Sequence, residues 1–322
     1  MSKVIGIDIS KATFDVGFKC KEQWPHHVFS NDLRGFRSFK KIIDSDDHCV
    51  MEASGPYYLQ LAMYLHSQGI RVSVVNPLVI RRFGQMRLTR AKTDKKDARI
   101  IAQYGIKESP APWSPEEKHI IHMRQMFTTI QNISKQIDMS NKQLGAFEST
   151  GMLCREVKST LRGLIKTLSQ KKEKLQAQLI ELTKQHYQQT FDRLQTIPGL
   201  GPKTAVLLTT ITNNFQKFEH SRQLIAYVGL SPRVFQSGTS IKGKGHICKM
   251  GSGVVRKQLY MCSWTAKFYN KGCRQMYDRL KEKGKPERVI KVAIANKLLK
   301  QAFAVVKNNV NFNENYVPKP CF

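Results

Sequence analysis

Short runs of β-branched and aromatic residues alternate with stretches of helical periodicity over the first hundred residues or so. Alternation at every second position predicts strands, and apolar spacings of three and four predict helices. The predicted strands are Val4 to Ser10, Thr13 to Lys19, His26 to Ser30, His48 to Ala53 and Arg71 to Asn76. The predicted helices are Leu33 to Ile43, Tyr57 to Gln68 and a helix that begins with Asp97 to Tyr104.

This order of elements predicts a mixed α/β sheet domain over residues 1–112. A three-stranded meander followed by alternating helix and strand is the order of ribonuclease-H-like sheets, and actin-like ATPases and sugar kinases share it. A proline-rich segment, Pro110 to Pro115, then forms a linker.

Residues 113–190 are predicted to be helical throughout. Leu161, Leu168, Leu175 and Leu182 recur every seven residues, as in the seam of a coiled coil. With a turn marked by the glycines at 145 and 151, this pattern predicts an antiparallel helical arm suited to dimerisation. The alternative, a pair of helices packed on their own domain, stays open.

Residues 191–322 predict a mostly helical third domain. The segment Leu194 to Ala205 has the form of a helix-hairpin-helix, in which Gly199 and Gly201 permit a tight turn whose N–H groups, with Lys203, can face phosphate. An ordinary tight turn between packed helices remains the alternative. Phe218 to Tyr227 predicts a further helix.

Composition narrows the classes of partner. The 322 residues include 53 Lys and Arg against 24 Asp and Glu, a net charge of +29 that favours nucleic acid. No stretch approaches about 18 apolar residues and the N-terminus lacks signal-peptide organisation, so no membrane partner is expected. Seven scattered cysteines, never at zinc or redox spacing, indicate free thiols of a reducing cytoplasm.

Four acidic residues in this basic chain are the candidates for a catalytic site. Asp8 and Glu52 lie in strands that otherwise look buried, and Asp94 and Asp97 are three apart at the start of a helix. A buried carboxylate needs a cationic partner, and converging carboxylates bind divalent metal for phosphodiester chemistry. The alternatives are a strand-end aspartate that binds a turn, and acids that cap a helix.

Basic residues gather in the last hundred residues with few acids to oppose them. They predict a phosphate-binding surface. The helical tail contributes Arg256, Lys257, Lys267, Arg274, Arg279, Lys281, Lys283, Lys285, Arg288 and Lys291, and the polar loop before it contributes Arg233, Lys242 and Lys244. That loop also holds Ser237, which by its local sequence is only a weak candidate nucleophile.

Several segments together resemble the insertion-sequence one-ten family of transposases, the bridge-RNA-guided DNA recombinases. They are Gly6 to Lys11, Met51 to Tyr57, Val75 to Pro77, Lys92 to Arg99, Ile197 to Gly201 and Ala226 to Pro232. The resemblance implies a RuvC-like domain whose Asp-Glu-Asp-Asp metal site falls on Asp8, Glu52, Asp94 and Asp97. It further implies a C-terminal transposase domain with its nucleophilic serine at Ser237, and protomers joined by the coiled coil.

The resulting hypothesis is a cytoplasmic transposase that inserts and excises its own element. Mg²⁺, or Mn²⁺ in its place, would be held by the four acids, and Ser237 would attack the scissile phosphate. The expected partners are donor and target DNA, a guide RNA as the resemblance implies, and further copies of the chain in a dimer or tetramer. The alternatives are a RuvC-like metal-dependent nuclease, a non-catalytic nucleic-acid scaffold and an actin-like kinase.

Overall fold

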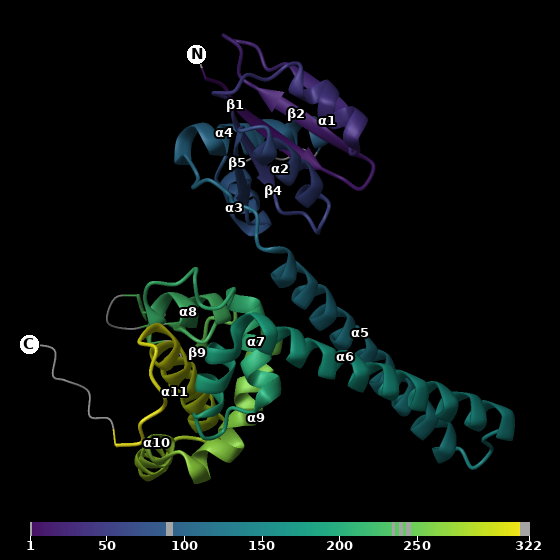
Figure 1. The fold of residues 1–322 in the computed structure, drawn as a ribbon, viewed down its shortest axis with the longest axis vertical. Helices are drawn as coiled ribbons and strands as arrows, with labels where there is room; N and C mark the ends of the chain where they lie inside the picture. Colours follow the sequence, from purple (N-terminus) through teal and green to yellow (C-terminus); the bar gives the residue numbers. More distant parts are fainter. Residues whose placement is uncertain (1, 88–92, 234–235, 238–240, 243–245, 316–322) are drawn as a thin grey trace, which may run out of the picture. The chain divides into compact units, whose positions relative to one another are not determined.

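The computed structural model describes residues 2–87, 93–233, 236–237, 241–242 and 246–315, the two short pieces by their backbone alone. The chain divides into two compact units, Met1–Glu116 and Glu117–Phe322 (Figure 1). Within the described residues, no helix is both long and apolar enough to cross a bilayer. The six described cysteines are free thiols.

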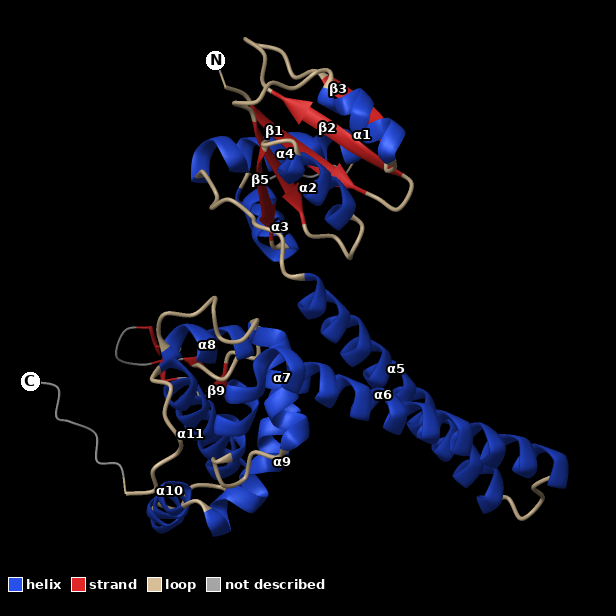
Figure 2. Cartoon of the chain, viewed as in Figure 1, coloured by secondary structure: helices blue, strands red, loops and turns tan. Residues whose placement is uncertain are grey.

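The first unit is built on a five-stranded mixed sheet of order β3-β2-β1-β4-β5, drawn in red in Figure 2. β1 pairs antiparallel with β2 and parallel with β4, as the predicted meander and crossovers require. The strands are β1 (Val4–Ile9), β2 (Thr13–Phe18), β3 (His26–Ser30), β4 (His48–Glu52) and β5 (Arg71–Val75). All five predicted strands form, so the mixed α/β sheet is confirmed.

Four helices cover the two faces of this sheet. They are α1 (Leu33–Lys40), α2 (Tyr58–Ser67), α3 (Pro77–Met86) and α4 (Asp94–Glu108). Ile5, Ile7 and Ile9 of β1 belong to the same buried cluster as apolar side chains of α1 and α2. Because side chains alternate along a strand, Gly6 and Asp8 belong to the opposite face, where α4 packs on β1. The helix α3 was not predicted, although Asn76 caps it and Pro77 begins it.

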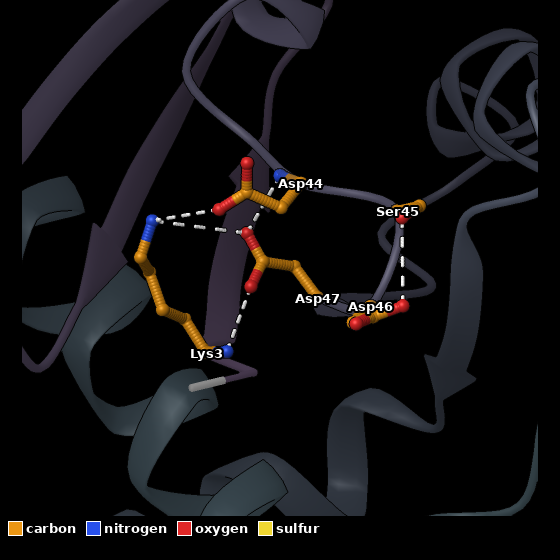
Figure 3. A network of polar contacts seen from close by, with 5 residues as sticks. All are labelled: Lys3, Asp44, Ser45, Asp46 and Asp47. Carbon is orange, nitrogen blue, oxygen red and sulfur yellow. Dashed lines mark hydrogen bonds and ion pairs between the residues drawn. The ribbon is translucent and has the colours of Figure 1, made fainter.

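The relative position of β1 and β4 is fixed at their first residues by Asp47, which is fully buried. Its carboxylate accepts hydrogen bonds from the backbone N–H of Lys3 at 2.7 Å and from that of Asp44 at 2.9 Å (Figure 3). The Lys3 ammonium lies 3.5 Å from Asp44 and 4.0 Å from Asp47. The two parallel strands therefore start in register, which aligns the residues near their other ends.

α4 lies unusually close to β1, and glycine makes this possible. A Cβ atom on Gly6 would lie 2.1 Å from the carbonyl oxygen of Ala98 and 2.3 Å from the backbone nitrogen of Ala102. Gly105, one turn farther along α4, instead faces the side chains of Val4 and Val50, so the backbone of β1 and that of α4 meet at Gly6. The contact is therefore backbone against backbone, with no side chain at Gly6 to set a wider spacing.

The second unit begins with two long helices, α5 (Lys118–Ser149) and α6 (Arg155–Gln195), which pack against each other as a hairpin. The turn between them lies near Gly151, which has a φ of 69°. Gly145 lies inside α5 rather than in the turn, so that part of the prediction is wrong. α6 departs from helical geometry at Tyr187, where φ is −140° and ψ is 39°.

The rest of this unit is a helical body around one apolar core. Its helices are α7 (Pro202–Thr212), α8 (Ser221–Val228), α9 (Gly253–Tyr269), α10 (Lys271–Glu282) and α11 (Glu287–Lys307). Four two-residue strands lie between α8 and α9: β6 (Pro232–Arg233), β7 (Gln236–Ser237), β8 (Ile241–Lys242) and β9 (His246–Ile247). α11 packs on α8, α9 and α10, and its buried residues run along most of its length.

The close approach of α4 to β1 can be tested by adding one methyl group to the chain. Gly6→Ala should lower the free energy of unfolding by about 3 kcal/mol, because the new Cβ overlaps the backbone of α4. Gly17→Ala is the matched control, since its Cβ would meet the carbonyl carbon of Ala98 at an ordinary 3.4 Å. Urea unfolding measures both, and equal stability of the two variants would contradict the account.

Candidate functional site

Asp8 and Glu52 share the face of the sheet that α4 covers. Gly6, two residues before Asp8, faces α4 directly, and Val50, two residues before Glu52, packs with Ile101 of that helix. The parallel register pairs Ile7 with Met51, so the two acids follow at the same end of neighbouring strands. β1 and β4 are thus neighbours in the sheet, which is the condition under which the two acids lie side by side.

Asp94 and Asp97 occupy the first turn of α4. The residue that caps this helix is Thr93, whose Oγ1 accepts a hydrogen bond from the backbone N–H of Lys96 at 3.3 Å. Thr93 is therefore the N-cap, and N-capping does not explain why Asp94 and Asp97 occupy this turn. The positive end of the helix dipole still favours carboxylates there.

The contact between α4 and β1 brings three of the four predicted acids together. One carboxylate oxygen each from Asp8, Asp94 and Asp97 lies within 4.8 Å of the others. Glu52 is not in this group, and its Oε1 accepts a hydrogen bond from the Ser54 hydroxyl at 2.8 Å. Glu52 is nevertheless near enough to act electrostatically on Asp8.

The electrostatics of this group raise the pKa of Asp8 to about 6. Burial is the largest cause, and the negative charges of Asp97, Glu52, Asp94 and Asp15 add to it. Ionisation of Asp8 is thus opposed by its own neighbours in the metal-free protein. A cation among these carboxylates would relieve that repulsion.

Asp15 is an acid near this site that the sequence reasoning missed. It pairs with Asp8 across β1 and β2, and its Oδ1 lies 2.6 Å from Nε2 of His26 on β3. The alternation Phe14-Asp15-Val16 was the available signal, since Phe14 and Val16 are buried on the opposite face. His26 is a local partner for Asp15, and among the described residues no hydrogen bond or ion pair is made by the carboxylate of Asp8.

The donor set fits a hard divalent cation. All three clustered ligands are carboxylates, and oxygen donors suit Mg²⁺, Mn²⁺ or Ca²⁺ rather than a metal that prefers nitrogen or sulfur. Asp94 is exposed and the other two are half-buried, so an ion could retain water ligands and reach a substrate.

Ser237 and the predicted phosphate contacts belong to the second unit. The backbone of Ser237 lies in β7 and pairs with Ile241 of β8, a short hairpin that also includes the backbone of Lys242. The side chains of both residues, and all of Lys244, lie outside the described residues. Arg233 lies in β6, exposed and paired through its backbone with His246.

Two predicted phosphate contacts in α9 have different surroundings. Arg256 donates from Nη1 to the carbonyl oxygens of Val228 at 2.8 Å and Gly251 at 3.0 Å, so its guanidinium holds two segments together. Lys257, the next residue, is exposed.

The predicted helix-hairpin-helix occupies the end of α6 and the start of α7. Gly199 adopts a φ of 102°, and a Cβ there would lie 2.7 Å from the Cβ of Ala266 on α9. Gly199 is therefore required by packing inside the protein. Gly201 precedes α7 as its N-cap, and Lys203 is exposed in its first turn. A DNA-binding role for this turn stays a prediction.

The raised pKa of Asp8 can be tested by measuring the stability of the folded protein. In EDTA at pH 7.5, Asp8→Asn should stabilise the protein by about 1 kcal/mol, after allowance for the partial exposure of the carboxylate. The folded pKa of Asp8 lies above its ordinary value, so the penalty appears as pH rises toward and through about 6 and vanishes below about 4.

Thermal melting with and without Mn²⁺ measures this effect. Added Mn²⁺ should raise the melting temperature of the wild type and leave that of Asp8→Asn nearly unchanged. Asp46→Asn is the control, because it removes an exposed carboxylate from a turn outside the cluster. A destabilised Asp8→Asn that still responds fully to Mn²⁺ would rule out this description of the cluster.

Two family models match this chain, and both are models of transposases. A transposase family model named for the DEDD transposases of IS110 matches residues 5–147, which include all four acids. A second model, the transposase IS116/IS110/IS902 family, matches residues 191–278, which include Ser237.

Individual proteins are also similar in sequence to this chain. The pilin gene-inverting proteins of Moraxella lacunata and Moraxella bovis are each 32% identical to this chain, over 98% of it and 99% of the relative. The transposase of insertion sequence element IS1328 from Yersinia enterocolitica is 33% identical over 39% of this chain and 38% of its own length. The chain therefore belongs to the IS110 family of insertion-sequence transposases, a family of DNA recombinases.

Proposed function

We propose that this chain cuts and rejoins DNA strands at the ends of its own insertion sequence through a serine nucleophile assisted by divalent metal. The observation that carries the proposal is the group of three carboxylates within 4.8 Å in a chain of net charge +29. A basic protein attracts a polyanion, and a carboxylate cluster on it is suited to metal-assisted chemistry on phosphodiesters.

Asp8, Asp94 and Asp97 would hold Mg²⁺, and Glu52 would complete the set from the neighbouring strand. Mn²⁺ should substitute, because it accepts the same oxygen ligands. When bound, the metal supplies charge neutralisation at the scissile phosphate and lowers the pKa of a coordinated hydroxyl. The role of the chain is to hold four carboxylates in place against their mutual repulsion.

Ser237 would supply the nucleophile. Its Oγ forms a bond to phosphorus as the bond from phosphorus to the 3′ oxygen breaks, and the departing oxygen takes a proton to become a 3′-hydroxyl. The seryl proton is lost to solvent or a nearby base. The phosphoserine ester conserves the energy of the broken bond, so that strand rejoining needs no ATP.

The acids and Ser237 belong to different units of the chain, and we propose that an assembly of several copies brings them together. The arm formed by α5 and α6 is the proposed means of association into a dimer or tetramer. Phe147 and Leu164 on this arm are 39% and 45% exposed, and apolar side chains left at a surface favour association. The acids of one copy would then serve the serine of another.

A guide RNA that pairs with donor and target DNA is the proposed source of target choice. Support for it is the resemblance to the bridge-RNA-guided recombinases together with the charge of the chain. Basic residues bind RNA and DNA phosphates alike, so the protein would contribute backbone contacts and chemistry, and base pairing would contribute sequence.

Site-specific inversion is a second candidate, favoured by one observation. The relatives that match over 98% of this chain are named as pilin gene-inverting proteins. Inversion and transposition use the same cleavage and rejoining, and they differ in how the two DNA sites are arranged.

A covalent adduct tests the serine chemistry. Wild-type protein incubated with Mg²⁺, guide RNA and labelled target DNA should yield a DNA–protein species that survives denaturation, and Ser237→Ala should abolish it. Asp97→Asn should also abolish it while nucleic-acid affinity stays within about twofold, because a metal ligand and not a phosphate contact is lost. Phosphopeptide mapping should locate the adduct.

The neighbouring residues Thr239 and Ser240 provide the controls for this experiment. Alanine at either position should preserve the adduct, since each shares the polarity of the segment but not the proposed role. If Ser237→Ala still recombines DNA, then Ser237 is not the nucleophile. An activated water would then cleave the strand, as in a RuvC-like nuclease.

The two candidate functions separate on plasmids that carry paired sites. If the chain transposes, an excised circle and an insertion at a vacant target should be the main products. If it inverts, reversal of the segment between two opposed sites should dominate, with no insertion elsewhere. Sequencing across the junctions measures both, and strand breaks without any new junction would contradict either function.

A further inference from the structure

The helical unit contains a cavity of about 550 Å³ whose lining is cationic and apolar. The cations are Lys249, Arg256, Lys257 and Arg288, and Leu230 and Val292 contribute apolar surface. No aspartate or glutamate among the described residues lines it. A site of this chemistry fits a ligand that joins an anionic group to a flat apolar one, such as a nucleotide.

Three of these cations are available to a ligand. Arg256 is committed to two backbone carbonyls, as described above. Lys249, Lys257 and Arg288 are exposed, and in the described part of the chain none has an ion pair with a carboxylate. Their charges are therefore uncompensated at the rim of an apolar hollow.

Aromatic side chains continue from the cavity along α9. Lys257, Met261, Trp264 and Phe268 are spaced by four, three and four residues, so they share one side of the helix. Met261, Trp264 and Phe268 are 55%, 48% and 55% exposed. From Lys257 to Phe268 the helix rises about 16 Å. That length accommodates several stacked bases at about 3.4 Å per nucleotide.

The two aromatic rings are supported by cations beneath them. The ammonium of Lys291, only 3% exposed, lies 3.1 Å from the centre of the Trp264 ring, and that of Lys267 lies 4.8 Å from the centre of the Phe268 ring. Glu287 neutralises one of these two charges, at 3.1 Å from Lys291 and 3.4 Å from Lys267. These contacts hold the two rings in place, and one net positive charge remains beside them.

Glu287 is in turn held by a hydroxyl. It accepts a hydrogen bond from Tyr277 at 2.7 Å, and this bond, with Lys291, lowers the pKa of Glu287 to about 2. Lys267 and Lys291 were predicted from the sequence as phosphate contacts. Lys291 is buried and Lys267 is partly buried, and both contact aromatic rings and Glu287.

We propose that the cavity and this side of α9 form a binding track for single-stranded DNA. One unpaired nucleotide enters the cavity with its phosphate against Lys257 and Arg288, and the following bases stack on Trp264 and Phe268. The proposal rests on the recombinase function, because strand cleavage and exchange expose unpaired DNA. Ile247 of β9 lines the cavity, and in the sequence Ser237 lies between β9 and its partner strand β6.

Single-stranded DNA suits this surface better than a duplex. Aromatic rings stack on any base whose face is free, whereas the faces of paired bases are covered by their neighbours. Cations that contact phosphates would add affinity that falls with salt.

The test is the affinity of the full-length chain for a labelled 12-nucleotide DNA strand, measured by fluorescence anisotropy in EDTA. Trp264→Leu and Phe268→Leu should each weaken binding roughly tenfold, whereas Trp264→Phe and Phe268→Tyr should stay within about threefold because a stacking ring remains. Lys257→Glu and Arg288→Glu should weaken binding and reduce its salt dependence. Lys166→Glu, an exposed site on the arm with the same charge change, is the control.

The outcomes separate this inference from the proposed function. Leucine variants that bind the strand as well as their aromatic counterparts would overturn the inference, as would equal or tighter binding of the matching duplex. An RNA strand of the same sequence that binds tenfold more tightly would overturn the assignment to DNA. Because EDTA prevents cleavage, failure of the metal or serine chemistry leaves this binding intact, and Ser237→Ala should bind normally.

Discussion

The contact between the backbones of α4 and β1 is the constraint on which the candidate site depends. Gly6 allows the two elements to touch without a side chain between them, and Ala98 and Ala102 meet it from the helix. Asp8 follows Gly6 by two residues, and Asp97 precedes Ala98 by one. The spacing of the carboxylates is therefore set by the packing of small residues beside them. Asp47 determines the register of β1 with β4, because its carboxylate aligns the starts of the two strands.

Charge is used differently in the two units. In the sheet domain, acids repel one another at one end of the strands, and burial raises the pKa of Asp8 to about 6. In the helical domain, cations are placed both outside and inside. Lys257 and Arg288 face solvent at a cavity, whereas Lys291 is buried under Trp264. Metal binding and strand binding are thus assigned to separate surfaces, which allows one to be removed without the other.

The sequence predicted local patterns well and distant juxtapositions poorly. Alternation gave all five strands of the sheet, and the acids at the ends of β1 and β4 followed from strand order. Gly6 was not singled out, although a glycine within a strand often marks a close backbone approach. The cavity could not be predicted, since Leu230, Lys257 and Arg288 come from segments far apart in the chain. A basic run likewise does not reveal which lysine is buried, as Lys291 is.

The central claim is that Asp8, Asp94 and Asp97 form one metal site, and Mn²⁺ binding followed by electron paramagnetic resonance tests it most directly. Titration of the wild-type chain should show loss of the free Mn²⁺ signal with saturable binding, and Asp8→Asn and Asp94→Asn should each weaken that binding at least tenfold. Asp46→Asn should bind as the wild type does. Equal Mn²⁺ affinity in all four proteins would show that these carboxylates do not act together as a metal site.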